Sequence, residues 1–458
     1  MTSTLLRGRT LSFLRWPETV DDHPAWRYED DGGLLLRNGR IVAAGAYADV
    51  EKKADEGAKK IDHRPHLLLP GLIDAHAHFP QMQVIASYGA ELLDWLNTYT
   101  FPEETKFQNA QHGRRIARLF LDEVVRHGTT TVAAYCSVHR ESAEAFFAES
   151  HDRNMLNIAG KVMMDRNAPE GVLDTPQSAY DDSKALIAEW HGKGRQHYAI
   201  TPRFAITSSP EQLEMASALC REHPDLHMQT HLSENHAEIA FTLQLYPKAS
   251  DYTDVYEHYG LLGRKSLFGH CIHLSEREAD ALSDTGSVAV FCPTSNLFLG
   301  SGLFDYQRYR RREKPLRIAT ATDVGGGTNY SMLRTMDEGY KVIALNGEKL
   351  NPFQSFWQLT RGNAEALSIV ERIGTLDPGS DADIVVLDAR ATPAMRLRME
   401  TADTLAEELF LLQTLGDDRA VREVYVAGRA AKTDMAIWLS HTSRLDPAAA
   451  IGQSLQRS

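Results

Sequence analysis

Two histidines with one residue between them, His76 and His78, stand just after the apolar run 71–73. Side chains at i and i+2 of a β-strand point to the same side, so both imidazoles can reach one metal ion. The pair alone is weak evidence, because two ordinary polar residues at a strand end have the same spacing. Further groups that each follow an apolar or β-branched run strengthen the metal hypothesis: His231, His270 and Asp323. Histidines with a carboxylate are typical ligands of Zn²⁺, Fe²⁺ or a similar borderline ion.

A second carboxylate is placed for proton transfer. Glu234 lies three residues after His231, where a strand is expected to turn into a helix. A carboxylate that leans over an open metal site without binding the metal can move protons between water and substrate. The alternative is a carboxylate in the first turn of a helix, stabilised by the helix dipole. The metal context favours the first interpretation.

These groups need a scaffold that brings distant strand ends together. Eight apolar or β-branched runs predict strands at residues 71–74, 129–135, 157–164, 198–204, 227–231, 267–272, 288–292 and 318–323. Helical segments follow them, and repeated βα units form a parallel sheet. Eight units predict an α/β fold with a closed (β/α)₈ barrel, in which the ends of the strands meet at one mouth. A doubly wound open sheet is the alternative, but no G-x-G-x-x-G opens a helix here.

The two chain ends have a different pattern, with short strands and turns. An Asn38-Gly39 pair between apolar runs predicts a hairpin. Similar strands are expected at residues 381–387 and 421–428, so the two ends are predicted to form one small domain. The predicted domains are residues 1–68 and 374–432 as two parts of a β-sandwich, 69–373 as the barrel, and 433–458 as a C-terminal tail.

Composition excludes several classes of protein. The chain has 458 residues and a formal net charge of −13, whereas nucleic-acid binding needs clustered Lys and Arg. The basic run 308–312 is expected to be a solvated loop. Four cysteines are too few for a disulfide scaffold of this length, and no apolar stretch is long enough for a membrane span. A soluble cytoplasmic protein that binds neither nucleic acid nor membrane is predicted.

The segment 70–78, followed in order by His231, His270 and Asp323, resembles the amidohydrolase superfamily. Residues 374–387 resemble part of its β-sandwich. Within the superfamily, the chain is most similar to the members that deaminate guanine. That similarity is carried by residues 79–81, 92–102, 201–204, 231–235, 292–296 and 322–327. It therefore covers nearly the whole chain.

The resemblance implies roles for particular residues. One Zn²⁺ per subunit, with Fe²⁺ as an alternative, would be bound by His76, His78, His231 and Asp323. His270 would lie beside the metal's water, and the catalytic groups would be Glu234, Asp323 and His270. The implied substrate is guanine, and the implied assembly is a homodimer. The implied substrate-binding residues are Gln81 and Arg203 at the carbonyl edge, Phe204 on the ring, and Trp95.

Several alternatives stay open at this level. Arg203 could instead form an ion pair at the barrel mouth, and Phe204 could be a core residue. Residues 325–327, all glycine, are more typical of a tight turn after Asp323 than of an anion-binding loop. Hydantoinase-like relatives use a lysine to bridge two metal ions. Lys161 lies well before the end of the third strand and is poorly placed for that role, which favours one metal over two. Other possible functions are a modified-purine deaminase, a chlorohydrolase or a non-catalytic homologue.

Overall fold

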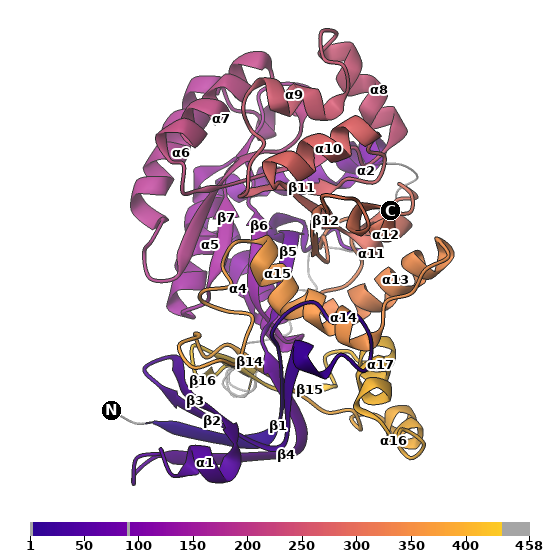
Figure 1. Ribbon diagram of the computed structural model, residues 1–458. Helices are drawn as coiled ribbons and strands as arrows, with labels where there is room; N and C mark the ends of the chain where they lie inside the picture. Colours follow the sequence, from indigo (N-terminus) through magenta and orange to yellow (C-terminus); the bar gives the residue numbers. More distant parts are fainter. Residues whose placement is uncertain (1–2, 89–91, 433–458) are drawn as a thin grey trace, which may run out of the picture.

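The computed structural model describes residues 3–88 and 92–432, which form a barrel with a second sheet at one end (Figure 1). Parallel strands pair in the order β5-β6-β7-β9-β10-β11-β12-β13, and β8 pairs with β9. The N–H of Asp323 donates to the carbonyl of His76 (2.9 Å), and that of His78 donates to Val324 (3.0 Å). The segment after β13 is thereby joined back to β5. The predicted (β/α)₈ barrel is confirmed. Its strands are β5 (Leu72–His78), β6 (Thr129–Tyr135), β7 (Asn157–Gly160), β8 (Val162–Met163), β9 (Gln196–Pro202), β10 (His227–Leu232), β11 (Ser266–His270), β12 (Val288–Phe291) and β13 (Arg317–Thr320).

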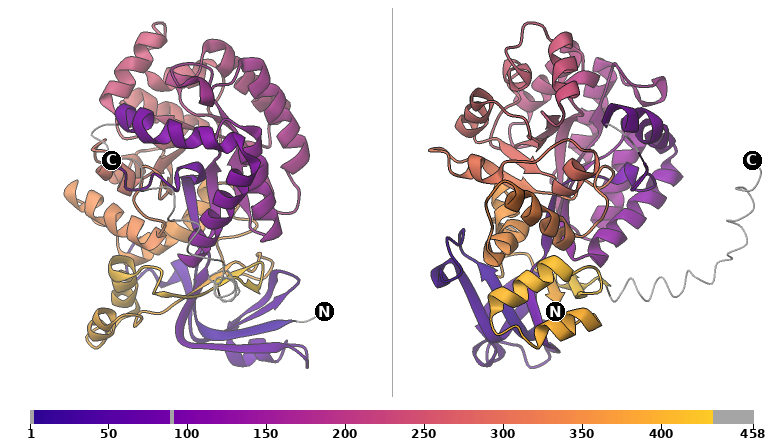
Figure 2. Two further views of the ribbon diagram at one scale, coloured as in Figure 1. Left: turned by 180° about the vertical axis from the view of Figure 1, so that it is seen from behind. Right: turned by 90° about the vertical axis from the view of Figure 1, so that its right-hand side faces the viewer.

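Helices alternate with these strands and cover the outside of the barrel, as Figure 2 shows. In α4, buried Ile116, Phe120 and Val124 recur at helical spacing and face the core. The helices are α4 (Ala110–Arg126), α5 (Arg140–Asp152), α6 (Pro176–Trp190), α7 (Pro210–Glu222), α8 (His236–Leu245), α9 (Tyr252–His258), α10 (Glu276–Thr285), α11 (Pro293–Phe298), α12 (Tyr306–Arg310), α13 (Met332–Leu345), α14 (Pro352–Trp357) and α15 (Asn363–Ala366).

Several strand boundaries differ from the sequence prediction, and three of the differences concern Lys161, His270 and Asp323. The third strand is divided into β7 and β8, because Lys161 between them turns its buried ammonium to Asp174, 2.6 Å away. The sixth strand ends at His270 instead of residue 272, since His270 and Cys271 have positive φ. The eighth ends at Thr320, so Asp323 lies in the loop after the strand and also has positive φ.

The second sheet takes strands from both ends of the chain, in the order β16-β15-β14-β4-β1-β2-β3. β4 pairs antiparallel with β14, which confirms that the ends share one sheet. Asn38 and Gly39 both have positive φ and form the expected hairpin turn between β2 and β3. The C-terminal tail predicted for 433–458 lies outside the described residues. The strands are β1 (Thr4–Phe13), β2 (Trp26–Arg37), β3 (Arg40–Ala46), β4 (Lys59–Pro70), β14 (Ile384–Leu387), β15 (Val421–Val426) and β16 (Arg429–Ala430), with helices α1 (Tyr47–Glu51), α16 (Pro393–Met399) and α17 (Leu405–Leu415).

Gly71 is the single residue between β4 of this sheet and β5 of the barrel. A Cβ there would lie 2.2 Å from the hydroxyl of Thr130, so only glycine fits this crossing. The described part of the long connection after β5 contains five short helical elements before α4 and no strand. They are η2 (Phe79–Gln81), α2 (Leu92–Trp95), η3 (Leu96–Thr100), α3 (Phe101–Glu104) and η4 (Thr105–Gln108).

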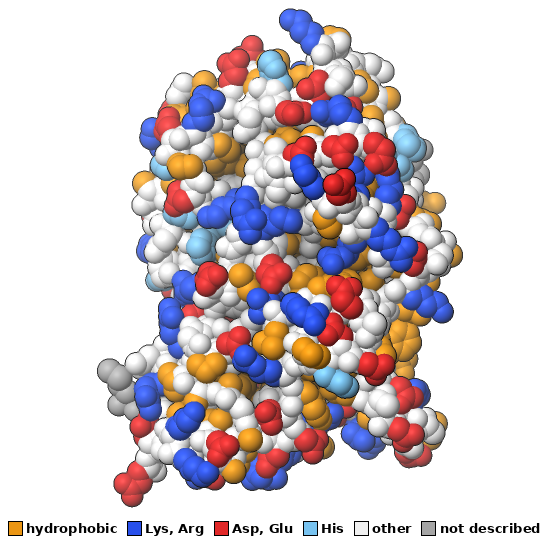
Figure 3. Space-filling view, in the orientation of Figure 1, with side chains coloured by type: hydrophobic (Ala, Val, Ile, Leu, Met, Phe, Trp, Pro, Cys, Tyr) orange, Lys and Arg blue, Asp and Glu red, His pale blue; other side chains and the backbone are white. Residues whose placement is uncertain are grey.

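Acidic and basic side chains are interspersed on the face shown in Figure 3. The expectation of a solvated loop at residues 308–312 was wrong in part, because α12 includes residues 308–310. Arg308 and Arg312 both form ion pairs with Glu276 of α10, so opposite charges neutralise much of this basic run. All four cysteines are unpaired. None of the helices in the described ranges is long and apolar enough to cross a membrane.

Candidate metal centre and active site

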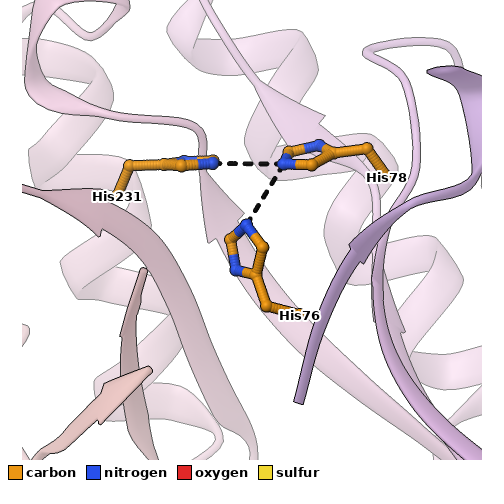
Figure 4. A group of neighbouring side chains, drawn as sticks. All are labelled: His76, His78 and His231. Atoms are coloured by element: carbon orange, nitrogen blue, oxygen red, sulfur yellow. Dashed lines mark hydrogen bonds between the residues drawn. The ribbon is translucent and has the colours of Figure 1, made fainter. Parts of the chain in front are cut away.

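Three imidazoles meet at the C-terminal end of the barrel strands (Figure 4). His76 and His78 come from β5, and His231 comes from β10. The Nε2 of His78 lies 3.2 Å from that of His76 and 3.1 Å from that of His231. All three are buried, and their ring nitrogens could bind one metal ion. The alternation of side chains along β5 thus has the effect expected from the sequence.

Asp323 and His270 complete the cluster. The Oδ1 of Asp323 lies 3.3 Å from His76 Nε2 and 3.4 Å from His78 Nε2. Its Oδ2 lies 3.8 Å from His270 Nε2. Both Asp323 (φ 50°) and His270 (φ 70°) adopt the left-handed backbone region, which non-glycine residues adopt at a cost. Such strain is common at functional sites, and here it turns both side chains into the barrel mouth.

The hydrogen bonds of two histidines fix which nitrogen is free. His231 Nδ1 lies 2.7 Å from the carbonyl oxygen of Arg203, which can only accept, so Nδ1 carries the proton. His270 Nδ1 likewise donates to Oδ1 of Asn296, 2.9 Å away. The Nε2 lone pair of His231 therefore faces the cluster, as in metal sites whose ligands are oriented by outer hydrogen bonds. The Nε2 of His270 faces the carboxylates of Glu234 and Asp323.

The charge states of these groups also fit a cation. Burial lowers the pKa of His78 and of His231 well below the usual range, so both imidazoles are neutral at physiological pH. Burial alone would raise the pKa of Asp323, but its hydrogen bond and charge interaction with His76 lower it to about 2. Neutral imidazoles and an ionised carboxylate are the forms that bind zinc or iron. The residues present therefore fit one divalent metal.

Glu234 lies in the loop between β10 and α8, with its carboxylate beside His270. Its Oε2 is 3.3 Å from His270 Nε2, and its Oε1 accepts a hydrogen bond from Ser301 (2.9 Å). Burial raises the pKa of Glu234. The alternative role, stabilising the start of α8, is performed by the capping box of Asn235 and Glu238 instead.

One buried pocket contains most of the side chains that the sequence analysis singled out. His76 is absent from the lining and lies behind it, within the metal cluster. The glycine turn at 325–327 leaves room for the side chain of Gln81 in this pocket, since a Cβ on Gly325 (φ 121°) would lie 1.9 Å from Gln81 Oε1. The lining residues are His78, Gln81, Leu92, Trp95, Leu96, Arg203, Phe204, His231, Glu234, His270, Leu299, Asp323 and Gly326.

A model of the amidohydrolase family matches residues 67–431. The chain belongs to the amidohydrolase family. This amidohydrolase is 43% identical over 422 residues to guanine deaminase of Escherichia coli (strain K12), covering 91% of this chain and 96% of the relative. The solved structure named E. coli guanine deaminase superposes with a TM-score of 0.91 and 42% identity, covering 93% of this chain and 99% of that one. Guanine deaminase from C. acetobutylicum, solved with guanine bound in the active site, gives a TM-score of 0.83 at 29% identity, covering 94% of this chain and 100% of that one.

Sequence reasoning missed several residues that hold this site in place. Asp74 accepts hydrogen bonds from the amide and the hydroxyl of Thr322, beside Asp323, and burial raises the pKa of Asp74 to about 7. Glu104 pairs with Arg203 (3.0 Å), so Arg203 forms an ion pair and also lines the pocket. A lone Asp within a strand motif, or one of two adjacent glutamates, gives no distinctive sequence signal.

Lys161 takes no part in the metal cluster or the pocket. Its ammonium is paired with Asp174, and it is not among the residues that line the pocket. The metal-binding groups found in the described chain are histidines with Asp323. These donors form one cluster, which suits a single metal.

Proposed function

We propose that this amidohydrolase hydrolyses guanine to xanthine and ammonia. The observation that carries the proposal is one buried pocket in which Gln81, Arg203 and Phe204 face the histidine–aspartate cluster. The relatives that are 43% and 37% identical over most of the chain are named guanine deaminase and probable guanine deaminase, and one similar structure was solved with guanine bound. Aromatic, amide and guanidinium groups beside a metal cluster suit a planar heterocycle with a carbonyl edge.

The proposed metal is one Zn²⁺ per subunit, with Fe²⁺ as the alternative. His76, His78, His231 and Asp323 would hold it. When bound, such an ion lowers the pKa of water to about 7 and so supplies hydroxide near neutral pH. His270, whose Nε2 faces the cluster, would orient the attacking oxygen toward the substrate carbon.

The substrate is proposed to be held by its carbonyl edge and its ring face. Arg203 offers only donors, in a rigid planar fork, which matches a carbonyl oxygen. Gln81 offers both a donor and an acceptor, so it can bond to adjacent ring positions. Phe204 supplies an aromatic surface, and the indole N–H of Trp95 has no hydrogen-bond partner among the described residues. These groups set the amine-bearing carbon toward the cluster.

Proton transfer is assigned to two carboxylates. Asp323 accepts the proton of the attacking water. Glu234, whose pKa burial raises, gives its proton to the ring nitrogen next to the amine-bearing carbon. It then takes the proton of the added hydroxyl group and passes it to the departing amine, and the proton held by Asp323 restores Glu234 to its starting form. Water adds, the C–N bond breaks, and ammonia leaves in a neutral form. The hydrogen bond from Ser301 keeps one oxygen of Glu234 fixed and leaves the other toward His270.

Two further proposals are assembly as a homodimer, which rests on the resemblance, and a cytoplasmic location, which rests on the small number of cysteines. Neither is needed for the proposed chemistry, because all the groups proposed as metal ligands, proton donor and substrate contacts belong to one chain. Sedimentation of the purified chain would measure the first, and fractionation of cells the second.

A substrate panel tests the proposed function. Purified, zinc-loaded protein would be incubated separately with guanine, adenine, 2-aminopurine, 8-oxoguanine and 2-chlorohypoxanthine. The proposal predicts equimolar xanthine and ammonia from guanine, with the highest kcat/KM of the panel. A higher kcat/KM for the chlorinated or oxidised purine would assign the site to the alternative functions instead.

A further inference from the structure

Glu104 is a buried carboxylate just outside the pocket that contacts two residues lining it. It ends α3 in the long connection after β5, and its exposed fraction is 0%. Its Oε1 accepts hydrogen bonds from Gln81 Nε2 (3.0 Å) and from Arg203 Nη1 (3.0 Å). Its Oε2 lies 3.2 Å from the same Nη1. One carboxylate therefore joins the two side chains proposed to read the purine edge.

The contact with Gln81 determines which way its amide faces. An ionised carboxylate can only accept, so Glu104 must meet the NH₂ end of the amide. The oxygen end of Gln81 is then directed toward Gly325, where the missing Cβ leaves room for it. Without Glu104, both orientations of the amide would be available, and the donor and acceptor could exchange places.

The contact with Arg203 has two effects. It occupies Nη1, while Nε and Nη2 donate to no residue within the described ranges and remain for a ligand. It also neutralises the guanidinium, so the pair adds no net charge beside the pocket. A buried cation without such a partner would attract an anionic ligand more strongly.

We propose that Glu104 is a positioning residue that determines specificity for a neutral guanine. This inference rests on the proposed function. Glu104 fixes the orientation of the Gln81 amide and leaves Nε and Nη2 of Arg203 available to the ligand. By neutralising Arg203, it also weakens the binding of anionic purines. Xanthine is such a purine, because its second carbonyl group makes its ring N–H more acidic than those of guanine. Glu104 thus favours release of the product as well as recognition of the substrate.

The test is Glu104→Gln in the zinc-loaded protein, with Glu103→Gln as the matched control. Glu103 is the adjacent buried glutamate of α3, but it pairs with Lys106 and lines no part of the pocket. For E104Q we expect KM for guanine to rise about tenfold or more, with a smaller change in kcat and unchanged zinc content. Xanthine should inhibit E104Q more strongly than the wild type, most of all at alkaline pH. E103Q should match the wild type in both measurements.

A double-mutant cycle with Gln81→Ala tests whether Glu104 affects KM through Gln81. If Glu104 acts partly through Gln81, E104Q should raise KM less in the Q81A background than in the wild type. Glu104→Asp keeps the charge but shortens the side chain, so it should raise KM without strengthening inhibition by xanthine. If E104Q does not accumulate as folded protein, E104D replaces it in the test.

The inference is overturned if E104Q, or E104D in its place, leaves KM within twofold of an active wild type. It is also overturned if the effects of E104Q and Q81A are additive, or if E104Q loses zinc. Absence of guanine turnover in the wild type would instead refute the proposed function.

Discussion

His270 Nε2 lies 3.3 Å from Glu234 Oε2, and both side chains are buried at the mouth of the barrel. Burial alone would lower the pKa of His270, but the facing carboxylates Glu234 and Asp323 raise it. The group proposed to orient the attacking oxygen and the group proposed to carry the proton are therefore adjacent. Under the proposed mechanism, this short separation suits hydration and protonation of a heterocycle at neighbouring atoms.

Glu234→Gln tests the proton carrier. The amide keeps the shape of the side chain and can still meet Ser301, but it cannot exchange a proton. We expect kcat to fall by about 10²–10⁴-fold, the usual contribution of a positioned acid–base group, while zinc content and guanine affinity are retained. Steady-state kinetics and metal analysis would measure both. Glu238→Gln is the control, since that buried carboxylate caps α8, and it should cost stability while leaving kcat near the wild-type value. Loss of zinc from E234Q would instead make Glu234 a ligand.

Arg203→Lys tests the guanidinium fork. Lysine keeps the charge and the pairing with Glu104 but lacks the second planar donor. Losing one charge-assisted hydrogen bond costs about 1.5–3 kcal/mol, so kcat/KM for guanine should fall roughly 10- to 100-fold with zinc content unchanged. Arg166→Lys is the matched control, because Arg166 stacks on Tyr246 and does not line the pocket. An unaltered kcat/KM in R203K would place the purine edge elsewhere.

His78→Ala tests the ligand set. His78 contributes one of the three converging Nε2 atoms, and open zinc sites have few protein ligands to spare. We expect most bound zinc and most activity to be lost together. His112→Ala, a variant of a histidine on α4 outside the pocket, should keep both. Full zinc content in H78A would show that the other donors suffice.

His227 gives a prediction for stability against pH. Burial lowers its pKa to about 3, whereas an unfolded histidine has a pKa of about 6.5. The unfolded chain therefore binds the proton first, so the contribution of His227 to stability is complete above about pH 6.5 and is lost as the pH falls toward 3. His227→Gln should make the melting temperature fall less steeply between pH 6.5 and 4.5 than in the wild type. The exposed His258→Gln should not change that slope, and an equal slope in H227Q would contradict the assignment.

The histidines of the metal cluster could be predicted to lie together, because regular patterns in the sequence indicate their positions. Side-chain alternation places His76 and His78 together, and the βα repeat brings His231 and His270 to the same mouth. The loop position and the positive φ of Asp323 were not predictable, since both depend on hydrogen bonds between β5 and the segment after β13. Strain of this kind has no sequence signature in a non-glycine residue.

The contacts around the substrate pocket were only half predictable. Gln81 and Arg203 could be named from the family resemblance, but their shared partner Glu104 could not. The 104–203 pair joins segments far apart in the chain, and it forms only when the connection after β5 folds back over the barrel. Similarly, the division of the third strand follows from the buried pair of Lys161 and Asp174, a long-range effect that strand propensity does not contain.

Zinc titration of the chelated protein tests the central claim most directly. Protein stripped of metal would be mixed with increasing Zn²⁺, and guanine loss, xanthine formation and ammonia release would be followed at each step. The account predicts no turnover without metal, a linear rise up to one equivalent of Zn²⁺ per chain, and equal amounts of the two products. Full guanine turnover by the metal-free protein, or zinc-loaded protein that leaves guanine intact, would contradict it.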